Sequence, residues 1–225
     1  MSVGLRLALQ EERAAHLAER VRSLLGPFSG TEAALDSGSG TGSLAFALAP
    51  HVAEVVGVDI RADYLEAARA QAPANVRFVE GDAMALPFGY GEFDIAGCYR
   101  VLHHVRRPEL AVSELARVTR VGGRLLVVDQ LGSVDPLHSL ELDRFERLRE
   151  PTHQRLLPDA DIRGFLDSND LVVLRFEVTR ERVDLEQRLD LGGFSEEDRA
   201  RIRGPAPAVP YDVEVGWYVA RKPGP

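Results

Sequence analysis

The sequence predicts an α/β protein with a mostly parallel β-sheet, helices on both faces and one antiparallel edge strand. Apolar runs typical of buried strands alternate with helix-forming stretches between residues 33 and 129. Strands separated by helices imply βαβ units and parallel pairing, and right-handed crossovers place the helices on both faces. A glycine-rich turn over residues 38–42 follows the first apolar run, and an alternating segment over residues 211–220 ends the pattern.

The first half of the chain gives these elements in a regular order. A helix is expected over residues 5–25, because its apolar residues form a helical stripe that Gly26-Pro27 ends. That stripe consists of Leu5, Leu9, Leu17, Val21, Leu24 and Leu25. Strands are expected at 33–36, 55–59, 76–80, 93–98 and 124–129, with helices at 43–49, 61–71 and 108–119. Gly122-Gly123 is interpreted as a turn before the fifth strand.

The second half has a looser pattern. We expect helices over 137–150 and 158–168, a strand over 171–178, partial helix over 184–203, a loop over 204–210 and a last strand over 211–220. The last two strands are expected to pair as a hairpin, which would place an antiparallel strand at the sheet edge.

Composition limits the function classes. The chain has 225 residues and a net charge of −8, which argues against a nucleic-acid-binding face because such a face needs clustered Lys and Arg. The single cysteine, Cys98, is expected to be a small core residue. No apolar run is long enough for a transmembrane helix, and no signal peptide is evident, so a cytoplasmic location is expected.

Polar residues follow four of the predicted strands. Asp36 ends the first strand, Asp59 ends the second, Asp82 follows the third, and Tyr99 and Arg100 follow the fourth. The carboxyl ends of parallel strands meet at one edge of the sheet, where ligands bind in open α/β folds. These side chains are therefore expected to converge on one cleft beside the glycine turn.

Counting donors and acceptors suggests a nucleoside ligand. A carboxylate at Asp59 can accept from both hydroxyls of an adenosine ribose. Asp82 can accept from an adenine amino group while the Ala83 N–H donates to a ring nitrogen, and Asp36 can hold an ammonium group near the turn. The turn matches the dinucleotide fingerprint imperfectly, since Ser43 and Gly42 stand out of register, and no phosphate-binding Lys-Ser/Thr pair is present.

The arrangement resembles the class I S-adenosylmethionine-dependent methyltransferases, in particular the small ubiquinone/menaquinone-biosynthesis type (methyltransferase type 11). The first resembling stretch is Ala34-Leu-Asp-Ser-Gly-Ser-Gly-Thr-Gly42. Four more follow in the family's order, at residues 56–59, 80–88, 93–105 and 117–125. The family often has Cys where Ser39 stands, a change that leaves the backbone turn intact.

The resemblance implies a fold, a cofactor and residue roles. It implies a seven-stranded sheet with six parallel strands and one antiparallel strand, S-adenosyl-L-methionine as cofactor, and methyl transfer to a small-molecule acceptor. The implied cofactor-binding residues are Asp36, Gly38, Ser39, Gly40, Gly42, Asp59, Ile60, Asp82, Ala83, Tyr99 and Arg100. A single domain is expected over 1–225, with a helical cover (1–28), a cofactor-binding core (29–130), a substrate-side helical segment (131–170) and a hairpin region (171–225).

Histidines are the candidate catalytic bases, because their pKa lies near operating pH. His103 and His104 follow the fourth strand, and one of them is expected to face the cleft, although a packing role is equally open. His153 lies in a segment that resembles the substrate-side insertion of relatives. His104 and His153 are the two predicted catalytic residues. The histidine spacings indicate no metal site.

Three alternatives stay open at this point. The same fold could do non-methylating chemistry, as a cyclase or decarboxylase would, or act as an S-adenosylmethionine-binding module without turnover. A nicotinamide oxidoreductase fits least well. The expected partner is a small-molecule acceptor, with no nucleic acid and no membrane span, and a homodimer is an open possibility for the assembly.

Overall fold

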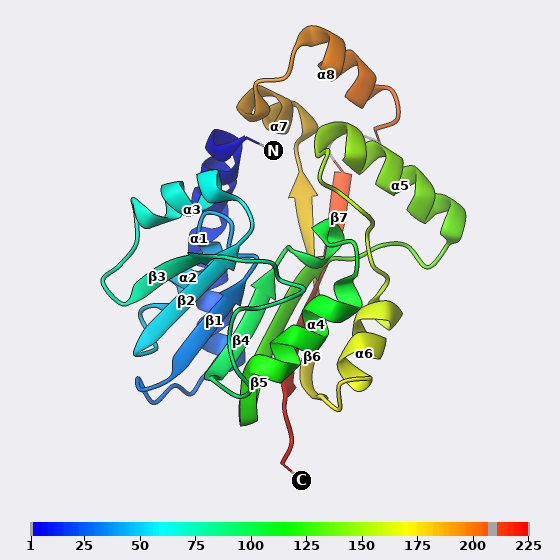
Figure 1. Cartoon of the computed structure of the whole chain (residues 1–225). Helices are drawn as coiled ribbons and strands as arrows, with labels where there is room; N and C mark the ends of the chain where they lie inside the picture. Colours follow the sequence, from blue (N-terminus) through cyan, green and yellow to red (C-terminus); the bar gives the residue numbers. More distant parts are fainter. Residues whose placement is uncertain (1, 207–210, 225) are drawn as a thin grey trace.

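One mixed sheet organises the protein. The computed structural model describes residues 2–206 and 211–224, and within them a seven-stranded sheet has the order β3-β2-β1-β4-β5-β7-β6 (Figure 1). The strands are β1 (Ala33–Ser37), β2 (Glu54–Asp59), β3 (Val76–Glu80), β4 (Phe93–Tyr99), β5 (Thr119–Gln130), β6 (Val172–Val183) and β7 (Tyr211–Arg221). The predicted fold class is confirmed, and all the predicted strands are present.

The antiparallel strand lies one position inside the sheet edge. Strands β1 to β5 pair in parallel, whereas β7 pairs antiparallel with both β5 and β6. The predicted hairpin therefore forms, but β6 and not β7 is the edge strand. Side-chain burial explains the choice, because Trp217 and Tyr218 of β7 are fully buried on opposite faces, while much of β6 is exposed.

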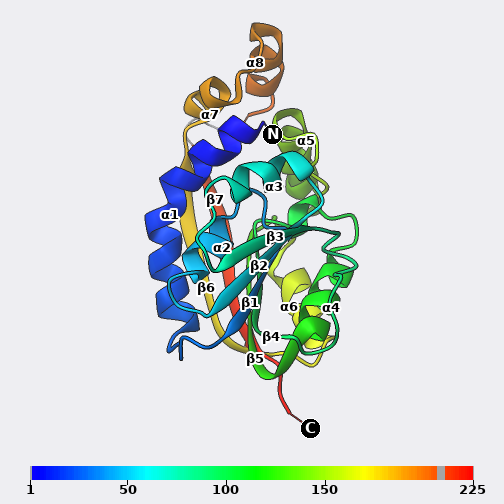
Figure 2. The ribbon, with the colours of Figure 1, turned by 60° about the vertical axis from the view of Figure 1, so that its left-hand side comes forward.

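Helices cover both faces and one end of the sheet. The helices are α1 (Val3–Leu25), α2 (Ser43–Leu48), α3 (Ala62–Arg69), α4 (Pro108–Val118), α5 (Pro136–Arg149), α6 (Asp159–Asp167), α7 (Leu185–Gly192) and α8 (Glu196–Arg203), with a 3₁₀ turn η1 at Leu102–His104. Helices α1 and α2 pack on one face, and α4 and α6 on the other (Figure 2). Helices α5, α7 and α8 gather near the carboxyl ends of the parallel strands (Figure 1).

Helix α1 confirms the predicted stripe. The six apolar residues expected on one face are the six that the helix buries, and Ser2 caps its start by accepting a hydrogen bond from the Leu5 N–H. Among the helices of residues 2–206 and 211–224, none is both long and apolar enough to cross a membrane. Cys98 is buried and unpaired, in agreement with a core role.

Strand β5 differs from the prediction at its start. It begins at Thr119, so Gly122-Gly123 lies inside the strand and not before it. The pairing with β4 is irregular there, and a Cβ at position 123 would lie 2.9 Å from the Asp94 carbonyl oxygen. Glycine is needed at position 123 because the backbones of β4 and β5 approach closely there, and not because the chain turns. The loop expected over 204–210 lies partly outside the described residues.

Candidate active site

The glycine turn between β1 and α2 is held by backbone contacts. The N–H groups of Gly38 and Ser39 both donate to the Val58 carbonyl oxygen, at 2.7 and 2.8 Å. Gly38 has a φ of +73°, and a Cβ there would lie 2.5 Å from a Val101 methyl carbon. Glycine at 38 therefore meets a conformational and a spatial requirement at once.

Asp59 connects the second strand to this turn. Its Oδ2 accepts from the Gly40 N–H at 2.7 Å, and its Oδ1 accepts from the Arg61 N–H at 2.9 Å. Each carboxylate oxygen can accept more than one hydrogen bond, so the side chain retains capacity for a ligand. The sequence placed Asp59 at the edge but did not reveal that it also fixes the turn.

Asp36 has a buried oxygen without a partner. Its Oδ2 accepts from the Ala45 N–H at 2.9 Å, whereas its Oδ1 is buried and makes no hydrogen bond with the described residues. Burial, and to a smaller extent the charge of Asp59, raises the pKa of Asp36 to about 7. Such an oxygen is suited to a cationic or hydrogen-bond-donating ligand.

Two cavities follow the strand ends. The strand-end cavity has a volume of about 260 Å³, close to the lower end of the range of roughly 300–1,000 Å³ typical of small-molecule sites. It is lined by Arg6, Gly38, Asp59, Ile60, Arg61, Tyr64, Gly81, Asp82, Ala83, Met84, Arg100, Val101, His104, Val105, Arg106 and Thr152. The glycine-turn cavity is lined by Arg6, Leu9, Gln10, Arg13, Asp36, Gly38, Ser39, Gly40, Thr41, Ser43, Leu44, Tyr99 and Arg100.

These two linings account for nearly all the predicted binding residues. Asp82, Ala83 and Ile60 line the strand-end cavity, and Ile60 is 69% exposed there. Asp82 also accepts from the Met84 N–H at 2.8 Å, so it shapes its own loop. Gly42 lines neither cavity; it caps α2 with a φ of +98°.

A third space, the arginine cavity, lies on the other side of Arg100. It is lined by Arg6, Leu9, Arg13, Arg100, His103, Gln130, Glu146, Arg149, Glu150, His153, Leu156, Val183, Arg188, Tyr211 and Val213. Arg6 and Arg100 line all three cavities. Arg100 has a φ of +59°, a left-handed conformation that is costly for a residue with a Cβ, and its guanidinium pairs with Glu181 at 2.5 Å.

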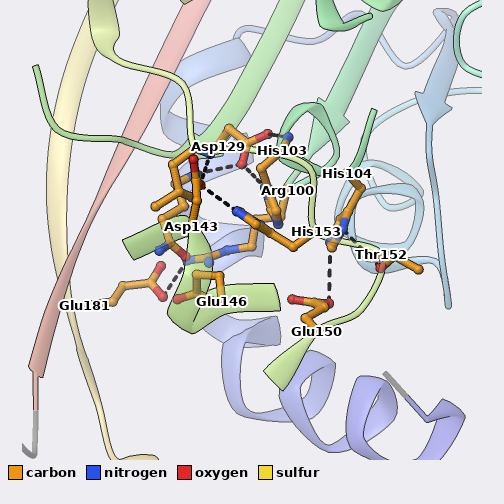
Figure 3. Close-up of polar contacts among 12 residues, drawn as sticks. Arg100, His103, His104, Asp129, Asp143, Glu146, Glu150, Thr152, His153 and Glu181 are labelled. Atoms are coloured by element: carbon orange, nitrogen blue, oxygen red, sulfur yellow. Dashed lines mark hydrogen bonds and ion pairs between the residues drawn. The ribbon is translucent and has the colours of Figure 1, made fainter. Parts of the chain in front are cut away.

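Three histidines surround this region (Figure 3). His153 is buried, and its Nε2 lies 2.8 Å from Asp143 Oδ1. His104 lines the strand-end cavity; its Nδ1 is 3.2 Å from the Thr152 hydroxyl, and its Nε2 is 3.4 Å from Glu150 Oε1. The predicted catalytic residues thus face different cavities, His153 the arginine cavity and His104 the strand-end cavity.

His103 is the histidine that sequence reasoning left out of the site. Its Nδ1 hydrogen-bonds the buried Asp129 carboxylate, and its ring lines the arginine cavity. Burial lowers the pKa of His103, against the opposing effect of Asp129. Burial alone would raise the pKa of Asp129, but His103 outweighs it and the pKa is lowered. At neutral pH the pair is therefore a neutral imidazole beside a carboxylate.

His103, His104 and Glu150 form a further cluster. Each offers one ligand atom, and these atoms lie within 4.8 Å of one another. The absence of a metal site was expected from histidine spacing, and that expectation stays a prediction. The spacing could not reveal the cluster because Glu150 comes from the end of α5, 46 residues along the chain from His104.

Helix α1 supplies functional side chains that the sequence gave no reason to single out. Arg6, Gln10 and Arg13 line the glycine-turn cavity, and Gln10 accepts a hydrogen bond from the Thr41 hydroxyl at 2.5 Å. These three residues lie between the buried leucines of the stripe. The sequence does not indicate that they face a cavity, because that depends on how the helix packs against the sheet. Helix α1 thus forms part of the wall of the glycine-turn cavity, and its role as a cover over residues 1–28 stays a prediction.

Comparison with known proteins gives the family. Residues 35–127 match the methyltransferase domain family. Over 141 residues the chain is 37% identical to the uncharacterized methyltransferase YcgJ of Bacillus subtilis (strain 168), a match that covers 61% of this chain and 56% of YcgJ. It is 43% identical over 100 residues to the demethylmenaquinone methyltransferase of Thermus thermophilus, covering 42% of this chain and 46% of that protein. The crystal structure of YcgJ has a TM-score of 0.86 at 25% identity, over 94% of this chain and 100% of that one.

The fold and the strand-end site define a class I methyltransferase fold. The chain belongs to the methyltransferase domain family, whose cofactor is S-adenosylmethionine, so the resemblance inferred from the ordered motifs is confirmed. The matched segments span about half the length of these two curated relatives.

Proposed function

We propose that this protein transfers the methyl group of S-adenosylmethionine to a small-molecule acceptor. The observation that carries the proposal is the junction of three cavities at Arg6 and Arg100. The strand-end cavity would hold the nucleoside, the glycine-turn cavity the methionine part, and the arginine cavity the acceptor. This arrangement brings cofactor and acceptor together at the end of β4.

The residues fit the cofactor. Asp59 would accept from the ribose hydroxyls, Asp82 from the adenine amino group, and the Ala83 N–H would donate to a ring nitrogen. The unpartnered Oδ1 of Asp36 would accept from the methionine ammonium group directly or through a water. Gly38, Ser39 and Gly40 would lie along the methionine part, with Gly42 preserving the turn, and Ile60 would pack on the adenosine. Tyr99 and Arg100 would border the reacting end.

Alignment is the main task of the chain. The bound cofactor supplies a methyl group already activated by a positively charged sulfur, and the protein has to orient the acceptor in line with it and exclude water. The helices α1, α5 and α7 would enclose the acceptor over the carboxyl edge of the sheet (Figure 1).

A base is required when the acceptor is a hydroxyl or a carbon acid. His104 and His153 stay proposed candidates, and His103 joins them. His103 is the strongest of the three on geometry, since a carboxylate on Nδ1 orients the ring and leaves Nε2 able to accept a proton. Its lowered pKa keeps it unprotonated at neutral pH.

The chain divides into four proposed functional segments. We propose the division into cover (1–28), cofactor core (29–130), substrate-side segment (131–170) and hairpin region (171–225) as functional segments of one domain. The homodimer and the cytoplasmic location stay predictions. The quinone named for one relative is not carried over, because several charged side chains line the arginine cavity.

The test is cofactor turnover on an acceptor panel. The full chain is incubated with S-adenosylmethionine and small phenols, enols, amines and thiols with and without acidic groups. We expect S-adenosylhomocysteine to form in proportion to a methylated product. Product without S-adenosylhomocysteine would favour non-methylating chemistry, and tight cofactor binding without any turnover would favour a binding module.

A further inference from the structure

The arginine cavity has an unusual excess of cations. Five arginines line it, Arg6, Arg13, Arg100, Arg149 and Arg188, against two lining glutamates. Buried guanidinium groups are costly unless they are paired. The negative charges that balance these arginines therefore determine which ligands the cavity can bind.

The available carboxylates do not match the arginines one to one. Arg13 and Arg100 share a single oxygen, Glu181 Oε2, at 3.5 and 2.5 Å. Figure 3 shows Arg100 beside Glu181. Arg149 pairs with Glu146. Glu150, the second lining glutamate, contacts His104, and it forms no ion pair with an arginine among the described residues.

Among the four of these arginines with an ion pair to a described residue, Arg188 of α7 has the most distant carboxylate. Its side chain is 6% exposed, and its nearest carboxylate is the half-exposed Glu12 at 3.9 Å. Within residues 2–206 and 211–224, this long contact is its only ion pair. Burial lowers the pKa of Arg188, and the charges of Arg149 and Arg100 lower it further against Glu12.

Arg13 also lies close to other positive charges. Burial, followed by the charge of Arg100, lowers the pKa of Arg13 to about 10. Guanidinium groups rarely leave their ordinary range, so these side chains are held close together at an electrostatic cost. An anion placed among them would reduce that cost.

The proposed cofactor does not supply the missing charge. S-adenosylmethionine carries a sulfonium, an ammonium and a carboxylate, which sum to one positive charge. Its carboxylate would be used in the glycine-turn cavity, where Arg6, Arg13 and Arg100 are within reach. Arg149 and Arg188 line only the arginine cavity, so the cofactor carboxylate would not add to the long pair that Arg188 makes with Glu12.

We propose, on the basis of the proposed function, that the acceptor carries an anionic group, a carboxylate or a phosphate, that binds Arg188 with help from Arg149. The planar guanidinium presents parallel N–H donors that match two oxygens of either group. Arg149 contributes a buried Nε without a partner among the described residues. The acceptor is thereby held by its anionic end, with its reacting end toward Arg100 and the cofactor.

Anion binding to the cofactor-loaded protein tests this proposal. The full chain is saturated with sinefungin, a non-reacting analogue that keeps a positive charge, and is titrated with inorganic phosphate or acetate at constant ionic strength against sodium chloride. Thermal stability and calorimetry report the affinity. The anion that binds more tightly indicates whether the acidic group of the acceptor is a phosphate or a carboxylate.

Matched variants assign the site. We expect Arg188→Gln to weaken anion binding about tenfold or more, because a charge-assisted bidentate contact is lost, while sinefungin affinity stays within about twofold. Arg182→Gln is the control, since Arg182 is an exposed arginine of β6 outside the cavity. Should Arg188→Gln fail to fold, Arg188→Lys keeps the charge, loses the fork and is expected to weaken binding about threefold to tenfold.

Several outcomes would overturn the proposal. One is that phosphate and acetate bind no better than the chloride control. Another is that Arg188→Gln or Arg188→Lys binds the anion as tightly as the parent. A third is that the anion binds only in the absence of sinefungin. The last outcome would mean that the anion had occupied the place of the cofactor carboxylate. Failure of sinefungin itself to bind would instead contradict the proposed function.

Discussion

The proposed cofactor side and the proposed acceptor side of the cleft are built by different means. On the cofactor side, carboxylates at the ends of β1 and β2 fix a glycine turn through backbone N–H groups, as Asp36 does at Ala45 and Asp59 at Gly40. On the acceptor side, long charged side chains from α1, α5, α7 and β6 form ion pairs that leave an excess of arginines. The first design presents fixed backbone dipoles, and the second presents ionic groups.

The two kinds of contact contribute differently to the free energy of unfolding. Hydrogen bonds between carboxylates and backbone N–H groups satisfy groups that the turn would otherwise leave unpaired. Buried ion pairs lose hydration that their mutual attraction only partly restores. The acceptor side is therefore explained better by ligand binding than by stability, and the two sides should respond differently to substitution.

Removing Asp59 should produce the largest change, confined to the cofactor side. Asp59→Ala loses the ribose contacts and the bond to the Gly40 N–H, so we expect sinefungin affinity to fall about 100-fold or more, at roughly 1.5–3 kcal/mol per hydrogen bond to a charged group. Calorimetry measures it. Glu66→Ala, an exposed carboxylate of α3, is the control, and parent-like affinity in Asp59→Ala would contradict the assignment of the nucleoside site.

Replacing His103 should affect stability and leave cofactor binding unchanged. His103→Gln removes the ring that hydrogen-bonds buried Asp129, although Asp129 keeps the backbone N–H groups of Gln130 and residue 103. We expect a loss of about 2 kcal/mol in the free energy of unfolding, with sinefungin affinity within about twofold. Urea denaturation tests it, with the exposed His138→Gln as control. A large loss of sinefungin affinity would show that the two sides are not separable.

The same pair gives the acceptor side a pH dependence. Because burial lowers the pKa of His103 below its unfolded value of about 6.5, the unfolded chain binds the proton more readily. The stability that His103 contributes is present above about pH 6.5 and is lost as the pH falls below it. The difference in unfolding free energy between the parent and His103→Gln should therefore shrink between pH 7.5 and about pH 5.5, and a constant difference would argue against a neutral imidazole.

Asp36 allows a sharper test of the cofactor side. With a pKa raised to about 7 mainly by burial, its carboxyl is largely protonated at about pH 6 in the ligand-free protein. An ammonium group at Oδ1 would lower that pKa, so binding should release up to about one proton at pH 6 and very little at pH 8.5. Calorimetry in two buffers of different ionisation enthalpy measures the release. Asp36→Asn should abolish it and weaken binding about tenfold, whereas release that persists in the variant would exclude Asp36 as its source.

Much of the cofactor side could be predicted from the sequence because it is encoded locally. Asp36, Asp59 and Asp82 each follow a strand, and parallel strands bring their carboxyl ends to one edge whatever the remaining packing is. The acceptor side has no such signal. Arg188 occupies a helix of eight residues, and only the docking of α7 against α1 turns it into a cavity. His103 and His104 are neighbours in sequence, and the geometry of η1 decides which ring faces which cavity.

The smallest predicted effect concerns Ile60, which separates folding from binding on the cofactor side. Ile60 is 69% exposed in a cavity wall, so its side chain contributes little burial to the folded chain. If adenosine covers Ile60, truncation to Ala removes about 40–60 Å² of apolar contact. At about 25 cal/mol per Å², this corresponds to an affinity loss of roughly fivefold to tenfold. Adjustment of neighbouring side chains should reduce the loss to about threefold. Ile60→Ala should therefore weaken sinefungin binding slightly while the unfolding free energy stays within about 0.5 kcal/mol of the parent. Val134, an apolar residue that is 85% exposed, lies outside the linings of all three cavities. Val134→Ala should change neither quantity, and equal effects of the two variants would place the adenosine elsewhere.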